Sequence, residues 1–431
     1  MTDDDLLTHM SILLQPDPKR VVIRPFDPAE DDPDTSLPRR AQRIADRVLG
    51  LKPDELAAER QRVSASLAGR YTDLEGIFTR RFRDVNGTAI KSCETTADQA
   101  RLIGAYFSEE YAFEAAALFN PSIVLHPNQE GVAAGAARFV LSLRAVGEGQ
   151  VSSVTFRTGV IAPDGTITVD PVSPYAMTPH IEFIPGGEPD DPGVRLVCGT
   201  GDDLSEAVIF PVTLSQRHGI EDVRLVRFID DDEKVSYYGT YTAFSGGGTR
   251  LGLLRTTDFI TFELNALRGD ATINKGMALF PRRIGGKYAM LGRQDHENIW
   301  LSLSDDLYHW QGRTKIVAPR YPWEFVQIGN GGSPIEIEEG WLVITHGVGP
   351  MRNYCLGVCL LDRKDPTKLL ARMETPLLRP NPQERYGYVP NVTYTCGALV
   401  MGRTLILPYA LADSFTKFAT VPLDKLLASM E

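Results

Sequence analysis

The 431-residue chain is short of cysteine, of net positive charge and of long apolar runs. Lys and Arg number 45 against 56 Asp and Glu, and this formal net charge of −11 argues against a nucleic-acid partner, which clustered cations would bind. No run of about 18 apolar residues occurs, so we expect no membrane partner. The first ten residues lack the basic and apolar segments of a signal peptide, so we expect a cytoplasmic protein.

Metal-binding and common catalytic motifs are also missing. The five cysteines have no metal-ligand spacing, so we expect buried thiols and no metal site: Cys93, Cys198, Cys355, Cys359 and Cys396. HExxH, GxSxG and CxxC do not occur, and the glycine-rich run at 329–334 matches no nucleotide-binding pattern. Zinc peptidase, serine hydrolase and nucleotide-loop interpretations therefore have no support.

The first 115 residues differ in composition from the rest. An acidic, proline-rich stretch runs from Pro25 to Pro38, and apolar residues then follow at helical spacing. Pro53 lies where a helix favours its first residue, and the segments 54–67, 72–84 and 96–118 are rich in Ala, Leu, Arg and Glu. We predict an acidic segment and helical extension over 1–115, of a kind that more often forms an oligomer surface than an active site.

From Phe119 onward the sequence consists of short β-branched or aromatic runs separated by Gly, Asp and Pro. Asp-containing turn segments recur near residues 256, 304 and 361, about 50 residues apart. Such a period is typical of propeller blades, and about 310 residues leave room for five or six of them. A two-sheet sandwich is the alternative.

One acidic group precedes an apolar strand. The run HGIEDVRLVRF places Glu221, Asp222 and Arg224 together, and strand alternation predicts that the two carboxylates point to opposite faces. One of them would face the central channel of a propeller, with the arginine holding a carboxylate or a substrate oxygen. The alternative is an ordinary strand-entry turn with a salt bridge.

Several cations are flanked by apolar strand residues. Buried cations need an anionic partner, which is either a protein carboxylate or a bound anion such as phosphate. Surface salt bridges are the alternative for any single one of these residues: Arg144, Arg157, Lys275, Arg293 and His346.

Aromatic residues next to polar turns could contact sugar rings, although half-buried packing is the commoner role for such residues. This group is Tyr241, Tyr288, Trp323, Tyr388 and Tyr409.

Six motifs in order resemble glycoside hydrolase family 130 over roughly residues 116–428. They are FNPSIV near 119, GIEDVRLVRF near 219, KGMALFPRRIGGKYAMLGR near 275, WEFVQIGNGGSPIEIEEGWLVITHGV near 323, GYVPNVTYTCGALV near 387 and PYALADSFTKFATVPLDKLL near 408. The resemblance implies a mainly β, five-bladed β-propeller catalytic domain over 116–431, acting on β-mannosides and most often as a phosphorylase. The N-terminal region resembles the helical extension of a longer branch of the family, through which we expect a homo-oligomer.

The resemblance also implies roles for single residues. Asp222 would be the catalytic acid, and its proton would reach the glycosidic oxygen through a hydroxyl of the bound mannose. Asn120 and Asp413 would hold the sugar, with Glu221, Tyr241 and Trp323 as further substrate-binding candidates. The phosphate candidates are Arg144, Arg157, Lys275, Arg293 and His346. Inorganic phosphate would be a co-substrate, and no other cofactor is implied.

Two departures from the family pattern affect the phosphate side. Gln327 stands where many phosphorylases of the family have Lys, and Gly292 stands where a His precedes Arg. Hydrolytic members lose cations there and activate water with a carboxylate, for which Glu221, Glu297 and Glu324 are candidates. We expect an inverting phosphorylase that releases mannose 1-phosphate from manno-oligosaccharides, with an inverting β-mannoside hydrolase or a non-catalytic carbohydrate-binding propeller as alternatives.

Overall fold

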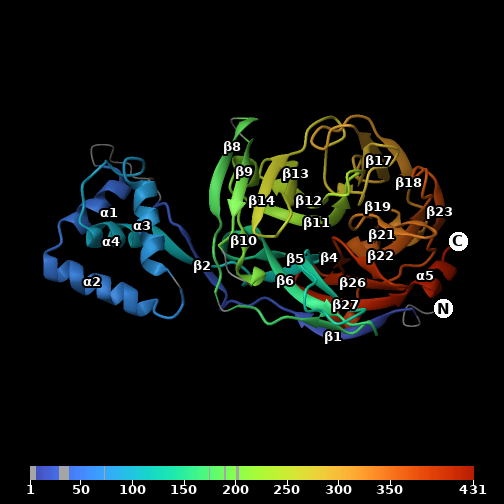
Figure 1. Ribbon diagram of the computed structural model, residues 1–431, viewed down its shortest axis with the longest axis horizontal. Coiled ribbons are helices and arrows are strands. Elements are labelled where there is room, and N and C mark those ends of the chain that lie inside the picture. The colour runs from blue at the N-terminus through green and yellow to red at the C-terminus, as the bar shows by residue number, and fades with distance from the viewer. Residues whose placement is uncertain (1–5, 29–37, 72, 174, 189–190, 200–202) are drawn as a thin grey trace. The chain divides into compact units, whose positions relative to one another are not determined.

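The computed structural model of the chain describes residues 6–28, 38–71, 73–173, 175–188, 191–199 and 203–431. The chain divides into two compact units (Figure 1). Residues 1–18, 113–173 and 179–431 form a β unit, and residues 19–112 and 174–178 form a smaller unit with most of the helices. The prediction of a mainly β protein with few helices is confirmed.

Among its described residues, the smaller unit contains four helices and one pair of antiparallel strands. Its elements are β2 (Val21–Pro25), α1 (Arg40–Leu49), α2 (Pro53–Ser66), α3 (Leu74–Val85), α4 (Ala97–Tyr106) and β3 (Ser108–Ala112). As predicted, α2 begins at Pro53, and the side chain of Glu55 accepts a hydrogen bond from the Lys52 amide at its start. None of the helices among the described residues is long and apolar enough to cross a membrane.

The predicted helix over 96–118 is wrong beyond Tyr106. Residues 108–112 pair with β2 instead, and the chain from Ala117 pairs with a strand that begins at Ala137. These long-range ladders outweigh the helix propensity of the Ala- and Glu-rich segment. The acidic stretch between Pro25 and Pro38 lies largely outside the described residues, since 29–37 are not among them.

The largest sheet of the β unit has eleven strands. They are β4 (Ala117–Leu125), β5 (Ala137–Val146), β6 (Ser152–Ile161), β7 (Ile167–Val169), β8 (His180–Glu188), β9 (Asp191–Val197), β10 (Val208–Ile209), β11 (Gly219–Ile229), β12 (Val235–Phe244), β13 (Thr249–Thr256) and β14 (Thr261–Ala266). Two antiparallel groups make up this sheet, and they meet at a single parallel pair between Gly219 and Ser152.

Three further antiparallel sheets follow in chain order. The first contains β15 (Ala278–Leu279), β16 (Tyr288–Gly292), β17 (Ile299–Ser304) and β18 (Thr314–Val317). The second contains β19 (Gln327–Asn330), β20 (Ile335–Ile337), β21 (Gly340–Gly349), β22 (Asn353–Leu361) and β23 (Leu369–Arg372). The third contains β24 (Thr393–Tyr394), β25 (Leu399–Met401), β26 (Thr404–Leu411), β27 (Phe415–Pro422) and β1 (Thr8–Leu14), and helix α5 (Leu423–Ala428) follows β27.

The predicted Asp turns are confirmed at all three positions. The Asp258 carboxylate accepts from the amides of Ile260 and Thr261, at 2.8 and 2.9 Å, between β13 and β14. Asp306 makes the same kind of turn between β17 and β18, and Asp362 makes it between β22 and β23. Each turn therefore joins two strands of one antiparallel group.

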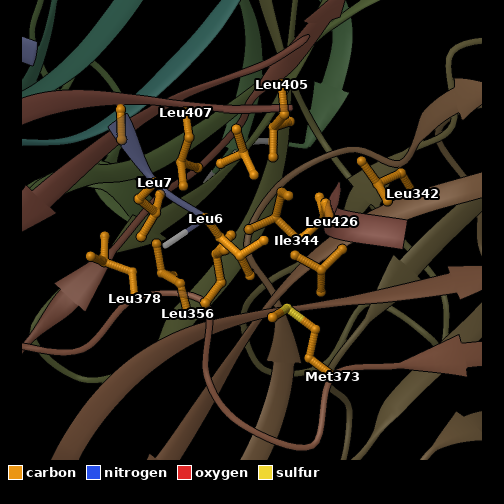
Figure 2. Packing of buried hydrophobic residues seen from close by; sticks show 14 of the residues in the cluster. Leu6, Leu7, Leu342, Ile344, Leu356, Met373, Leu378, Leu405, Leu407 and Leu426 are labelled. Atoms are coloured by element: carbon orange, nitrogen blue, oxygen red, sulfur yellow. The ribbon is translucent and has the colours of Figure 1, made fainter. Parts of the chain in front are cut away.

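The two ends of the chain meet in one sheet. Strand β1 pairs antiparallel with β27, although the sequence predicted an acidic and helical region over 1–115. Leu6 and Leu7 enter the core between β21, β22 and β26, where Figure 2 shows them near Leu356 and Leu407. Removing these side chains from water helps to attach β1 to the last sheet.

The cysteines follow the prediction of unpaired thiols. All five are free, and Cys198, Cys355, Cys359 and Cys396 are buried while Cys93 is half-buried.

Hydrogen bonds also join the antiparallel groups to one another near their first strands, and they bring distant parts of the sequence to one place. These bonds run from the Leu225 amide to Ser122 Oγ (2.9 Å), from Arg224 Nε to the Gly331 carbonyl (2.7 Å), from Asn330 Nδ2 to the Gly276 carbonyl (2.9 Å) and from the Cys396 amide to the Pro121 carbonyl (2.8 Å). Side chains on β4, on β11 and just before β15 can therefore meet.

Candidate active site

Asp222 lies at a bulge in β11. Glu221 pairs with Thr242 and Arg224 with Thr240. Between these two pairs β11 therefore has one more residue than β12. Asp222 has a φ of 55°, in the left-handed region that non-glycine residues seldom adopt. The prediction that Glu221 and Asp222 point to opposite faces is wrong, because the bulge breaks the alternation and both carboxylates contact Arg144.

Asn120 has the same local geometry on β4. The pairing of β4 with β5 shifts between Phe119 and Ser122, and Asn120 has a φ of 50°. Its side-chain Nδ2 donates to Asp222 Oδ1 at 2.7 Å. Two irregular strand positions, 102 residues apart in the sequence, thus bring an amide donor to a carboxylate.

Arg144 and Lys275 neutralise the two carboxylates. Arg144 Nη2 lies 2.8 Å from Glu221 Oε1, and its Nη1 lies 3.3 Å from Asp222 Oδ1. Lys275 Nζ donates to Glu221 Oε2 at 2.9 Å, and Arg144 Nε donates to Ser152 Oγ at 2.9 Å. Two predicted phosphate candidates and two predicted acidic residues therefore form one cluster.

The environment of Asp222 favours its ionised form. Burial raises the pKa of this carboxyl, but Arg144, Arg224, the hydrogen bond from Asn120 and Lys275 together outweigh burial and lower it. Asp222 is therefore a carboxylate at neutral pH in the absence of a ligand.

Asp413 lies between β26 and β27 with a φ of 49°. Burial and the negative charge of Asp222 raise the pKa of its carboxyl to about 6, with Arg144 opposing them. The cluster thus holds two aspartates whose pKa values are shifted in opposite directions, Asp222 downward and Asp413 upward.

Arg224 connects the cluster to two other groups of strands, those that begin with β19 and β24. It is buried, and it donates from Nε to the Gly331 carbonyl at 2.7 Å and from Nη2 to Tyr394 Oη at 2.8 Å. Burial raises the pKa of Tyr394 to about 12, so its hydroxyl stays protonated. The sequence pointed to Arg224 beside the acidic pair, whereas Tyr394 lies within the motif near 387 but was not singled out.

Arg293 and His346 form a second polar group. Arg293 Nη1 donates to His346 Nε2 at 2.9 Å and to the side-chain oxygen of Gln327, whose amide nitrogen donates to the His296 carbonyl at 3.1 Å. Burial, with help from Arg293 and Arg224, places the pKa of His346 well below its usual range. His346 is therefore a neutral acceptor that orients Arg293, whereas the sequence predicted it among the cations.

Three predicted site residues lie elsewhere. Arg157 makes a buried ion pair with Glu114, at 2.9 and 3.1 Å from its two oxygens. Tyr241 is buried in the core and accepts from Gln216 at 2.9 Å. Trp323 donates from its indole nitrogen to the Glu374 carbonyl at 2.9 Å, and its ring packs against the glycines of β21 and β22 at positions 347 and 357. The structure assigns these three side chains to packing because their partners are internal.

The proposed water-activating carboxylates also lie apart, except for Glu221. Glu324 is fully buried, pairs with Arg372 and accepts from the amides of Arg320 and Tyr321. Glu297 is an exposed residue of a turn. Neither residue has a contact with the Asp222 cluster among the described residues.

Comparison with known proteins shows the family to which the chain is related. A family model described as beta-1,4-mannooligosaccharide phosphorylase matches residues 202–431. The 1,2-beta-oligomannan phosphorylase of Thermoanaerobacter sp. (strain X514) is 37% identical over 216 residues, which are 49% of this chain and 71% of that protein. The beta-1,4-mannooligosaccharide phosphorylase of Ruminococcus albus is 33% identical over 211 residues, which are 46% of this chain and 62% of that protein.

A solved structure shows a similar fold. The beta-1,2-mannobiose phosphorylase of Listeria innocua, in complex with beta-1,2-mannobiose, aligns with a TM-score of 0.52 and 22% identity, covering 74% of this chain and 92% of that one. From the family match and these relatives, the chain belongs to glycoside hydrolase family 130.

Proposed function

We propose that the protein is an inverting phosphorylase that cleaves β-mannosidic bonds of manno-oligosaccharides with inorganic phosphate and releases mannose 1-phosphate. The observation that carries this proposal is the carboxylate of Asp222, held by Asn120 and Arg144 among buried cations, in a chain whose relatives are β-mannoside phosphorylases. Because a sugar phosphate is useful only where it is retained, a cytoplasmic location fits this activity.

We also propose that the β unit is a five-bladed propeller. Five consecutive antiparallel groups support it, since the eleven-stranded sheet divides in two at the Gly219–Ser152 pair and three further sheets follow. The pairing of β1 with β27 would join the chain ends in the last blade. Propellers bring the first strand of each blade to a central channel, and Asn120 and Asp222 lie on two such strands.

The charges of the cluster suit an anionic co-substrate. Arg144, Arg224 and Lys275 of the cluster, with Arg293 of the second polar group, provide four positive charges against the two carboxylates of Glu221 and Asp222, which leaves an excess of two. Asp413 lowers this positive excess by one further charge only when it ionises, above about pH 6. A phosphate anion would balance this excess through charge-assisted hydrogen bonds.

Phosphate binding would also prepare Asp222 as the acid. In the free protein the cations lower the pKa of Asp222, so its proton affinity is small. A bound phosphate adds negative charge beside these cations and raises that pKa. Asp222 would then carry the proton that passes, through a mannose hydroxyl, to the leaving oxygen, while phosphate attacks the anomeric carbon from the opposite side.

Hydrolysis is the second candidate, and two features favour it. Gln327 supplies an amide where a cation would hold phosphate, and Asp413 is a carboxyl with a pKa near neutrality that could activate water. Glu221 is less suited to that role, because both of its oxygens are engaged by Lys275 and Arg144.

A product assay tests the proposal. β-1,2- and β-1,4-linked mannobiose and longer oligomers are incubated with and without inorganic phosphate, and mannose and mannose 1-phosphate are measured. Phosphorolysis predicts no cleavage without phosphate and one mannose 1-phosphate for each bond broken. Free mannose formed at the same rate in both samples would establish the hydrolase, and no cleavage of any oligomer would favour a carbohydrate-binding protein.

A further inference from the structure

The tip of the β21–β22 hairpin has an unusual backbone. Pro350–Arg352 form one 3-10 turn, in which Met351 has a φ of 59° and Arg352 a φ of 51°. Two successive left-handed residues are the geometry of a tight hairpin turn, which places their side chains at the tip. Here it exposes both side chains, and Met351 is 88% exposed.

Arg352 is a cation beside the catalytic cluster. Its charge acts on Asp413, where it opposes the burial and the Asp222 charge that raise the pKa of that carboxyl. The Arg352 guanidinium forms no hydrogen bond or ion pair with any residue that the structure describes. Its donors are therefore free to bind a ligand.

Exposed apolar and aromatic side chains lie on the hairpin tip that carries this arginine and on two other loops. They lie on three loops: the segment before β19, the hairpin tip and the segment before β24. We call them the rim, and they are Phe325 (63% exposed), Val326 (61%), Met351 (88%), Tyr386 (85%) and Tyr388 (62%). Several exposed apolar side chains on neighbouring loops mark a binding site more often than singly exposed ones do.

Backbone hydrogen bonds hold the three loops beside Asp413. The Val326 amide donates to the Val348 carbonyl at 3.0 Å, which places the first loop next to the hairpin. The Tyr354 amide donates to the Asn391 carbonyl at 2.9 Å, which joins the other side of the hairpin to the third loop. The Tyr388 amide donates to Ser414 Oγ at 2.8 Å, so this tyrosine lies next to the turn that carries Asp413.

We propose that the rim and Arg352 bind the sugar units on the leaving side of the bond that is broken, and so set the preferred chain length. This inference rests on the proposed function. A pyranose offers C–H faces to aromatic and apolar side chains and hydroxyls to a guanidinium, which are the two chemistries exposed here. Of the aromatic residues singled out in the sequence, Tyr241 and Tyr409 are buried, whereas Tyr388 is free to make this contact.

Kinetics of the reverse, synthetic reaction distinguish binding on the donor side of the site from binding on the leaving side. With mannose 1-phosphate as donor, the acceptor sugar occupies the leaving side, so KM for mannobiose as acceptor is measured in wild type, Arg352→Met and Tyr388→Ala. We expect KM for mannobiose to rise about tenfold in each variant, with KM for mannose 1-phosphate unchanged. Phe183→Ala is the matched control, since Phe183 is an aromatic residue of β8 with 61% exposure, and we expect wild-type values for it.

Direct binding makes the result independent of turnover. Calorimetric titration with β-mannotriose should show a Kd about tenfold higher for both rim variants and unchanged for Phe183→Ala. Equal Kd and KM in all four proteins would overturn the rim proposal while leaving the proposed function in place. A change of oligomeric state in the rim variants, with unchanged sugar affinity, would also overturn it in favour of a contact between copies. A wild-type protein that neither binds nor cleaves manno-oligosaccharides would refute the proposed function itself.

Discussion

Asn120 donates a 2.7 Å hydrogen bond to the carboxylate of Asp222, and both residues hold left-handed backbone conformations at bulges in two different strands. Neither side chain would reach the other from a regular strand, because a bulge changes the direction in which a side chain points. The backbone irregularities therefore create the contact on which the acid assignment depends.

Replacing Asn120 should change the pH dependence of the reaction. Asn120→Ala removes a donor that favours ionised Asp222, so the pKa of Asp222 should rise. The high-pH limb of the kcat profile should then move to higher pH, on top of a loss of activity from weaker sugar binding. An unmoved limb, in a variant with wild-type thermal stability, would show that Asn120 does not tune the acid.

Asp413→Asn should stabilise the fold at neutral and higher pH. The folded pKa of about 6 lies above the ordinary 3.8, so the wild-type protein loses stability as pH rises between these values. The variant avoids this loss, and its free energy of unfolding should exceed the wild-type value by roughly 1–3 kcal/mol above pH 7 and match it below pH 4. Chemical denaturation at both pH values measures the difference, and a variant with no advantage at high pH contradicts the burial of an ionisable Asp413.

Arg293→Met should weaken phosphate binding. Arg293 is oriented by neutral His346, and the loss of one charge-assisted contact should raise KM for phosphate about tenfold or more. Initial rates over a range of phosphate concentrations provide the measurement. Arg282→Met is the control, because Arg282 pairs with Glu336 instead, and an equal rise in both variants would remove Arg293 from the phosphate site.

Glu324→Gln should affect stability and leave the type of reaction unchanged. The substitution leaves buried Arg372 without its carboxylate, so we expect a loss of about 3 kcal/mol in the free energy of unfolding. The exposed pair of Glu339 with Arg403 offers the control Glu339→Gln, which should cost much less. If Glu324→Gln keeps wild-type stability but changes the ratio of mannose to mannose 1-phosphate, then Glu324 acts in the chemistry.

The sequence predicted which residue types form the site better than it predicted where their side chains point. The acidic pair, Asn120 and the nearby cations were recognisable in motifs, but strand alternation assigned Glu221 and Asp222 to opposite faces because nothing in the sequence marks the bulge. Arg144 and Arg157 look alike as cations within apolar strands. Only the three-dimensional contacts show that Arg157 forms an ion pair with Glu114, whereas Arg144 forms one with Asp222.

Aromatic residues were harder to interpret for the same reason. Tyr241 and Trp323 pack against glycines of neighbouring strands, and such close contacts depend on strand register. The helices and Asp turns were easier to predict, because each depends on residues within one short segment.

The most direct test of the central claim is a 31P NMR time course with β-mannobiose and inorganic phosphate, comparing wild type with Asp222→Asn. The account predicts that wild type forms α-mannose 1-phosphate, the inverted product, while the variant is slower by about 10²-fold or more. Comparable product formation by the two proteins, or cleavage by wild type without any sugar phosphate signal, would contradict it.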